Sequence, residues 1–229
     1  MWKRVIKDFS KQIFKRPIIF EDLLRTEPVS QLFGFDRGTP IDRYYIDKFL
    51  TKNSHYIQGA VLEIAETSYS KAYGSNIVSY DILHTDHSNK KATIVGDLTN
   101  PLSLPENKID CFICTQTLNF IFDVQEAIKG CYRLLKDKGV LLCTVAGICQ
   151  ISRYDMDRWG DYWRFTDLSI RKLMESVFKK EDIDITTFGN VLSATAFLQG
   201  LAVEDFPDSK ILDEQDADYQ IVICIKAIK

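Results

Sequence analysis

Residues 109–145 read "IDCFICTQTLNFIFDVQEAIKGCYRLLKDKGVLLCTV" and hold a complete strand–helix–strand unit, which decides the fold. The unit opens on residues 109–115, apolar almost throughout, and closes on a second apolar run at 140–145, so both are expected to be buried strands. Asp123 predicts the start of the helix between them, because Glu126 three residues later completes a capping box. The inner face of this helix, up to the Gly139 that ends it, is formed by Val124, Ala127, Ile128, Cys131 and Leu135. Apolar strands joined by an amphipathic helix predict a parallel sheet that is covered on both faces.

The same alternation continues on both sides of this unit. Further strands are expected at residues 60–64, 77–81, 92–95, 183–188 and 219–228, and helices at 168–178 and 191–201. Only residues 65–76 separate the first two strands, so the helix between them is reduced to a turn or two around residues 70–73. The last strands follow one another in the manner of a hairpin, which predicts one antiparallel strand near the edge of the sheet.

The composition describes a domain-sized chain without a membrane span. It has 229 residues, 45% of them apolar, and no apolar run reaches the roughly 18 residues that a span needs. No apolar stretch with a small-residue cleavage site follows the charged N-terminus, and we expect a cytoplasmic protein. The net charge of −3 argues against a nucleic-acid partner, which usually requires a basic field. Cys111 and Cys114 have a CxxC spacing, but on a strand they point to opposite faces, so buried thiols are expected rather than a metal or redox pair.

The N-terminal segment is basic and amphipathic. Residues 1–20 hold six Lys or Arg and one Asp, and apolar side chains fall at helical spacing as far as Pro17. Such a helix either packs on its own domain or, through residues 1–16, docks on a partner or on the inner face of the membrane. We expect residues 1–53 to form a helical lead-in with a loop that covers the cofactor and substrate, and residues 54–229 to form the α/β domain.

Acidic residues stand where the expected strands end. In doubly wound sheets, ligands bind beyond the carboxyl ends of the strands. Asp81 lies 18 residues after Glu63, near the roughly 20-residue offset expected for an acid that binds ribose hydroxyls. Asp86 is the alternative if the second strand runs longer, and Asp97 at the third strand end is placed to accept from an adenine amino group. The pattern predicts a nucleoside site at this edge of the sheet.

Three stretches, in order, resemble the class I S-adenosylmethionine-dependent methyltransferases. They are "VLEIAE" (61–66), "GDLTNPLSLPENKIDCFICTQTLNFIFDVQEAI" (96–128) and "RLLKDKGVLLCTVAG" (133–147). Two further stretches, "FGFDRGTPIDRYYIDKFL" (33–50) and "DRWGDYWRFTDLSIRKLMESVF" (157–178), resemble a bacterial subgroup found with glycosyltransferases in surface-polysaccharide loci. The resemblance implies a doubly wound, Rossmann-like α/β fold. Its three layers would enclose a seven-stranded mixed sheet whose last strand is antiparallel.

The resemblance also implies S-adenosylmethionine as the cofactor. The residues expected to hold it are Asp97, Leu98, Gln116 and Thr117 around the adenine, Asp81 at the ribose, and Glu63 and Ala65 at the first strand end. Glu63 and Glu66 are placed to accept from its ammonium group. Its carboxylate needs donors, and either Arg37 or Arg43 of the lead-in suits it because an arginine fork matches a carboxylate.

The loop after the first strand departs from the family. The resemblance implies glycine at the positions of Ala65, Thr67 and Tyr69, where the cofactor touches bare backbone. Ala65 adds one methyl group, whereas Tyr69 is a large obstruction unless the loop takes another path. Two outcomes therefore stay open, a cofactor site built another way or a site that has decayed.

The segment after the fifth strand, "GICQISRYDMDRWGDYWRFT" (147–166), mixes aromatic, acidic and arginine side chains. Aromatic rings stack on the CH faces of sugars while charged groups bind their hydroxyls, and so dense a mixture on a loop points to function. Asp155 and Asp157 are the candidate bases that take the proton of an attacking hydroxyl. The expected substrate contacts are Tyr154, Arg158, Trp159, Tyr162 and Arg164.

Structural roles compete for some residues of this segment. Asp161 and Arg164 are spaced to form an ion pair with each other, and Trp163 and Phe165 are expected to anchor the segment in the core. No spacing typical of metal ligands appears, so no metal is predicted.

Together these features predict a methyltransferase that O-methylates a sugar or glycan intermediate with S-adenosylmethionine. The missing glycines leave one alternative, a catalytically inactive module of the same fold that binds a glycan or docks a glycosyltransferase.

Overall fold

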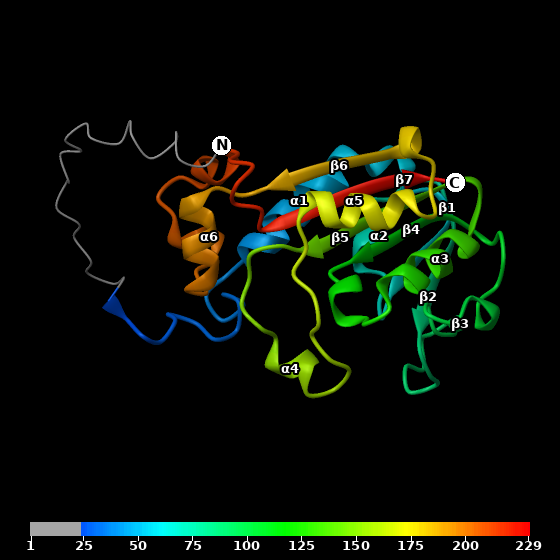
Figure 1. The fold of residues 1–229 in the computed structure, drawn as a ribbon, viewed down its shortest axis with the longest axis horizontal. Coiled ribbons are helices and arrows are strands. Elements are labelled where there is room, and N and C mark those ends of the chain that lie inside the picture. Colours follow the sequence, from blue (N-terminus) through cyan, green and yellow to red (C-terminus); the bar gives the residue numbers. More distant parts are fainter. Residues whose placement is uncertain (1–23) are drawn as a thin grey trace, which may run out of the picture.

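The core of the molecule is one seven-stranded sheet, in a computed structural model that describes residues 24–229 (Figure 1). Its strands are β1 (Gly59–Ile64), β2 (Ile77–His84), β3 (Ile94–Val95), β4 (Ile109–Thr115), β5 (Leu135–Ala146), β6 (Ile183–Phe188) and β7 (Val222–Ile228). They lie in the order β3-β2-β1-β4-β5-β7-β6. β7 runs antiparallel to both β5 and β6, and the other neighbouring pairs are parallel. The predicted seven-stranded mixed sheet with an antiparallel last strand is confirmed.

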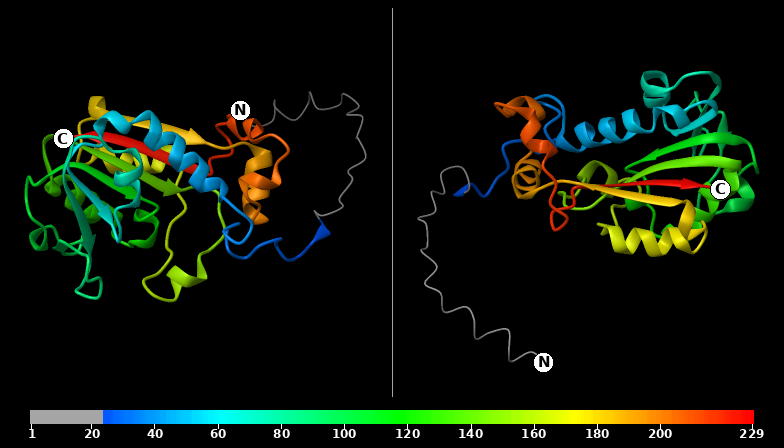
Figure 2. Two further views of the ribbon diagram at one scale, coloured as in Figure 1. Left: turned by 180° about the vertical axis from the view of Figure 1, so that it is seen from behind. Right: turned by 90° about the horizontal axis from the view of Figure 1, so that it is seen from above.

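Helices cover both faces of the sheet and give the predicted three layers (Figure 2). The helices are α1 (Ile41–Lys52), α2 (Ser68–Tyr73), α3 (Val124–Leu134), α4 (Arg153–Met156), α5 (Asp167–Glu175) and α6 (Val191–Leu198). Short 3-10 turns lie at Ser54–Tyr56, Pro101–Ser103, Leu118–Phe120, Lys180–Asp182, Val203–Asp205 and Ser209–Asp213. α3 and α5 pack on one face of the sheet, and α1 packs on the other, where side chains of α2 and α6 join the same core. Cys111 and Cys114 of β4 are both buried, one in each of these two cores, as their spacing on a strand predicts.

The unit at residues 109–145 forms as expected at its start. Asp123 accepts a hydrogen bond from the backbone N–H of Glu126 (3.2 Å), which caps α3. The Glu126 carboxylate binds Lys129 (2.6 Å) rather than returning to the cap. One half of the expected capping box is therefore present.

The expected end of this helix at Gly139 is wrong. α3 ends at Leu134, and Leu135 already pairs with Ile109 as the first residue of β5. The register then shifts before Cys111 pairs with Val140, so the polar residues between form an irregular stretch of strand. Periodicity alone could not separate this polar stretch from a last turn of helix.

β2 is three residues longer than expected, because its last residues are apolar or paired with β1. Ile82 and Leu83 are buried and pair with Glu63 and Ile64, so the strand continues to His84. Asp81 therefore lies inside the strand rather than at its end.

α1 belongs to the main packing of the domain. It buries Ile41, Tyr45, Ile46, Phe49 and Leu50 against the sheet, and the Tyr45 ring stacks on Phe188 at 5.3 Å. The boundary between residues 1–53 and 54–229 stays a prediction. The helix expected before Pro17, with its membrane or partner contact, lies outside the described residues. Among residues 24–229, no helix has the length and apolar character to cross a membrane.

Candidate active site

A cavity of about 1270 Å³ opens at the carboxyl ends of the parallel strands. Its floor includes Ala65 after β1, Gln116 after β4 and Ala146 at the end of β5. This is the edge at which doubly wound sheets bind ligands. The volume exceeds the roughly 300–1,000 Å³ typical of small-molecule sites, so there is room for a nucleoside together with a second substrate.

The loop after β1 holds an alanine in a conformation that favours glycine. Ala65 has a φ of 66°, its N–H donates to Leu83 (3.3 Å), and its carbonyl accepts from the side chain of Asn89 (2.8 Å). Phe33 and Gln116 also have positive φ and also line the cavity. Such backbone strain gathers at functional sites, where the surrounding structure enforces it.

Glu63 holds the start of the reduced helix α2. Its buried carboxylate accepts from the backbone N–H groups of Tyr69 (3.1 Å) and Ser70 (2.7 Å), and from the Ser70 hydroxyl. Burial raises the pKa of Glu63, and the hydrogen bonds from Ser70 and Tyr69 offset part of that rise. Glu63 lines the cavity as expected, and it also fixes the path of the loop that lacks glycines.

Tyr69 forms a wall of the cavity and does not fill it. Its ring packs beside Tyr73 at 6.4 Å, and its hydroxyl accepts a hydrogen bond from Arg43 of α1 (3.0 Å). Ala65 and Tyr69 both line the cavity. The loop thus takes the alternative path that a large residue at this position requires.

The two arginines of the lead-in have different roles. Arg37 forms a bidentate ion pair with Asp205 (2.6 and 2.8 Å). It does not line the cavity, so the expectation that it binds a ligand there is wrong. Arg43 lines the cavity beside Asp42, whose carboxylate is 4.0 Å away, and faces the Phe35 ring. Of the two lead-in arginines, only Arg43 lines the cavity; Arg153 and Arg164 line it from the segment after β5.

Asp81 does not reach the site, which corrects the position expected for it. It is buried within β2, and its carboxylate accepts from Ser79 (2.8 Å), Thr93 (2.7 Å) and Lys108 (3.3 Å). Burial alone would raise the pKa of Asp81, but these partners lower it below its usual value. The alternative, Asp86, follows the end of β2 and is exposed.

The remaining residues expected around the adenine divide into two groups. Gln116 lines the cavity, whereas Asp97, Leu98 and Thr117 do not. Leu98 is buried in the core, Asp97 accepts from Thr99, and Thr117 donates to a backbone carbonyl. Asp97 and Asp86 are both exposed on loops that follow strands of this half of the sheet.

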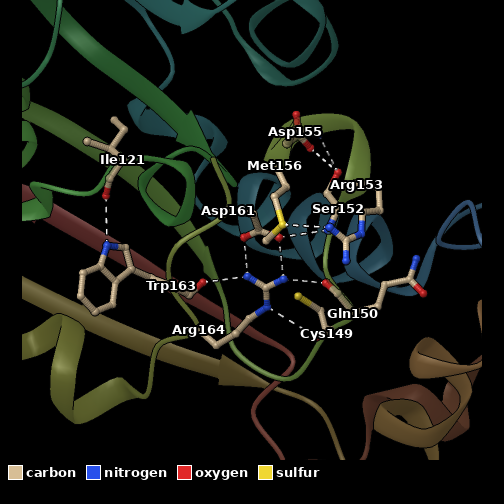
Figure 3. Close-up of polar contacts among 10 residues, drawn as sticks. All are labelled: Ile121, Cys149, Gln150, Ser152, Arg153, Asp155, Met156, Asp161, Trp163 and Arg164. Carbon is tan, nitrogen blue, oxygen red and sulfur yellow. Dashed lines mark hydrogen bonds and ion pairs between the residues drawn. The ribbon is translucent and has the colours of Figure 1, made fainter. Parts of the chain in front are cut away.

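Residues 147–166, which we call the acceptor loop, are fastened by an ion pair whose carboxylate is buried (Figure 3). Arg164 donates to both oxygens of Asp161 (2.6 and 2.8 Å), and the Asp161 side chain is 1% exposed. Arg164 also donates to the carbonyls of Cys149 and Gln150 (3.4 and 2.6 Å). The expected ion pair is confirmed. Arg164 was also expected to contact the substrate. Because its guanidinium is engaged by Asp161 and by the two carbonyls, Arg164 anchors the loop instead.

Of the two candidate bases, only one lines the cavity. Asp155 lines the cavity and accepts a hydrogen bond from the Ser152 hydroxyl (2.5 Å), whereas Asp157 is exposed and does not line it. Asp155 is therefore the carboxylate available to a substrate in the cavity.

The expected aromatic contacts lie at and outside the cavity mouth. Tyr154 lines the cavity, and Arg158 stacks over its ring at 3.5 Å, with Trp159 edge-on to it at 6.1 Å. Tyr162 does not line the cavity and instead packs against Phe122. Phe165 is buried as expected, while Trp163 is 39% exposed and is fixed by hydrogen bonds from its indole to two backbone carbonyls. These side chains form a partly exposed aromatic surface beside the cavity.

Sequence reasoning missed two cavity residues that matter. Asp42 and Asn119 both line the cavity, and Asn119 is buried with a side-chain oxygen that has no hydrogen-bond partner. No motif marks either residue. Only its place just after a strand end could have pointed to Asn119.

Comparison with known proteins adds a family match. Residues 57–143 match the family described as "Methyltransferase domain". No protein of curated function matches the chain.

Solved structures share the fold at low sequence identity. A methyltransferase dependent on S-adenosylmethionine (SAM) from Mesorhizobium loti aligns with a TM-score of 0.53 and 12% identity, over 86% of this chain and 100% of its own. A SAM-dependent methyltransferase from Archaeoglobus fulgidus gives 0.52 and 14%, over 82% and 94%. The [4+2]-cyclase SpnF gives 0.51 and 14%, over 84% of each chain. Residues 57–143 thus match a methyltransferase domain, and the chain shares its fold with SAM-dependent methyltransferases, a likeness that points to S-adenosylmethionine as the cofactor.

Proposed function

We propose that this chain transfers a methyl group from S-adenosylmethionine to a hydroxyl of a sugar or glycan intermediate. One observation carries the proposal: a single cavity joins the strand ends of a methyltransferase fold to a loop of carboxylates and aromatic rings. The strand-end half suits the cofactor, and the acceptor-loop half suits a polyhydroxyl substrate. The likeness of residues 33–50 and 157–178 to a polysaccharide-associated subgroup points to the same acceptor class.

The cavity residues fit the charged end of the cofactor. Arg43 is partly buried, has guanidinium donors beyond the one given to Tyr69, and would bind the carboxylate. Asp42 and Glu66 line the same cavity and would balance the ammonium group. In this arrangement the tyrosine that replaces a glycine orients the arginine that binds the ligand.

The nucleoside end of the cofactor would extend from Ala65 toward the loops after β2 and β3. Asn89 already bridges the β2 loop to the Ala65 carbonyl. Asp86 then takes the ribose role first assigned to Asp81, and Asp97 stays the candidate for the adenine amino group.

Bound S-adenosylmethionine supplies an electrophilic methyl group on a sulfonium sulfur. The protein must hold the attacking hydroxyl in line with it and remove the hydroxyl proton as the new bond forms. Asp155 is the carboxylate in the cavity that can accept this proton, and the Ser152 hydroxyl orients it. Tyr154, with Arg158 and Trp159 behind it, would stack on the sugar ring at the mouth.

Radiolabel transfer tests the proposal. The purified protein is incubated with S-adenosylmethionine labelled in its methyl group and a fixed panel of free sugars, sugar 1-phosphates and nucleoside-diphosphate sugars. We expect label in at least one sugar, and loss of that transfer in Asp155→Asn with unchanged affinity for S-adenosylhomocysteine. Absence of label from the whole panel would contradict the sugar assignment.

The side chains at the glycine positions favour a second candidate, a module that no longer catalyses and that binds a glycan or docks a glycosyltransferase. Glu63 is engaged by the loop itself, which would suit a site kept for its shape. The shared fold of SpnF, a cyclase, also shows that this fold supports more than one activity. A chain that binds glycan but not S-adenosylhomocysteine would select this candidate.

A further inference from the structure

Asn119 has an unusual environment for a cavity residue. It is 3% exposed, it lines the cavity, and its Oδ1 has no hydrogen-bond partner. Among residues 24–229, only one other buried side-chain atom, Oε1 of Gln199, shares this condition, and Gln199 does not line the cavity. A buried acceptor without a partner is destabilising, so native proteins keep few of them, and each calls for an explanation.

The main chain of Asn119 is fixed between the two halves of the cavity. The residue belongs to the 3-10 turn Leu118–Phe120, directly after β4. Its carbonyl accepts hydrogen bonds from the backbone N–H groups of Tyr162 (2.9 Å) and Trp163 (3.2 Å) of the acceptor loop. The carboxamide therefore stands where the strand end meets the loop that would receive the methyl acceptor.

We propose that Asn119 recognises the acceptor, with its carboxamide oxygen accepting a hydrogen bond from a hydroxyl of the sugar. The inference rests on the proposed function, since it names the acceptor as a hydroxyl compound. A carboxamide both accepts and donates, which matches two neighbouring sugar hydroxyls. It does not titrate, so Asn119 orients the acceptor and leaves the proton to Asp155.

Asn119→Leu tests the inference, with Gln199→Leu as the matched control. Each variant removes a buried amide oxygen without a hydrogen-bond partner, although Gln199 as a whole is only half-buried, so each should raise the Tm of the ligand-free protein, by about 2–6 °C. Both should bind S-adenosylhomocysteine as the wild type does. Only Asn119→Leu should lose transfer to the sugar that the wild type methylates best, by about tenfold or more in kcat/KM.

Four results overturn the inference. A lower Tm in Asn119→Leu than in the wild type would mean that the carboxamide has a structural partner. Weaker binding of S-adenosylhomocysteine would make Asn119 a cofactor residue. Retained sugar methylation in Asn119→Leu would refute acceptor recognition while leaving the proposed function intact, whereas a wild type that methylates no sugar would refute both.

Discussion

At the scale of the residue, Ala65 takes a backbone conformation that favours glycine in the loop after β1. Its backbone lies in the left-handed region, which costs an L-residue about 1–2 kcal/mol relative to ordinary conformations. Its methyl group adds little bulk, so the position keeps the glycine-like backbone while the cavity beside it stays open. The strain marks this turn as a functional feature.

Replacing Ala65 by glycine should stabilise the protein. Relief of the left-handed strain exceeds the added entropy of the unfolded chain, so Ala65→Gly should raise the free energy of unfolding by about 0.5–1 kcal/mol. Ala72→Gly in the exposed face of α2 is the control and should lower it by about 1 kcal/mol. Urea denaturation measures both, and equal destabilisation by the two changes would contradict the role of backbone strain.

Arg43 and Arg37 should differ in their effect on ligand binding. Arg43→Met removes a charge-assisted hydrogen bond to the ligand carboxylate, so affinity for S-adenosylhomocysteine should fall about 10- to 100-fold. Arg37→Met removes a residue that pairs with Asp205 outside the cavity and should leave the affinity within twofold. Calorimetry on the two variants decides, and equal losses would show that Arg43 has no special place at the site.

At the scale of the element, the Asp161–Arg164 ion pair is one of the anchors of the acceptor loop. The Asp161 side chain is buried and satisfied by Arg164 and by the Ser152 backbone N–H (3.0 Å). Burial opposes ionisation of Asp161, but the hydrogen bonds from Arg164 and Ser152 lower its pKa below the usual value. Asp161 therefore stabilises the fold above the unfolded-state pKa of about 4, and this contribution is lost as the pH falls through its folded pKa.

Breaking this pair should destabilise the loop in a pH-dependent way. Arg164→Met leaves a buried carboxylate without its partner, so the free energy of unfolding should fall by about 2–3 kcal/mol at neutral pH. This loss is smaller than for a fully buried pair, because Arg164 is partly exposed. The difference from the wild type should shrink below about pH 4. As a control, Lys129→Met breaks the exposed ion pair with Glu126 and should lower the free energy of unfolding by only about 0–1 kcal/mol. A pH-independent difference in urea denaturation would argue against the ion pair as the cause.

The elements were predictable from the sequence where apolar periodicity was clear, and their ends were not. β1, β4 and β6 match their expected ranges, within a residue; β1 and β4 are mainly apolar runs that meet polar residues, and β6 ends before Gly189. β2 and α3 differ because register with β1 and β4 extends or interrupts them, and register is a tertiary property.

The candidate site was predictable only in part for the same reason. Asp81 was assigned from its spacing to Glu63, but the longer β2 draws it into the sheet and leaves Asp86 beyond the strand end. The sequence could not tell whether Arg37 or Arg43 faces the site. The structure decides between them, because Arg37 pairs with the distant Asp205 and the packing of α1 places Arg43 beside Tyr69. Asn119 carries no motif, and its significance depends on a missing partner that only coordinates reveal.

At the scale of the whole molecule, the described N-terminal region completes the cavity of the sheet. Phe33, Phe35, Asp42 and Arg43, all before β1 in sequence, line it together with the ends of β1, β4 and β5 and the acceptor loop. The strand ends, the acceptor loop and the lead-in thus meet in one space, although α2 is reduced to six residues. The central claim is that this space binds an adenosyl cofactor despite the lost glycines.

Isothermal titration calorimetry of the wild-type chain with S-adenosylhomocysteine tests that claim most directly. We predict saturable 1:1 binding with a Kd of about 1–100 μM, in the range reached by a few charge-assisted hydrogen bonds and a buried adenine. No binding heat up to about 1 mM ligand, from protein shown to be folded by circular dichroism and at more than one temperature, would contradict it.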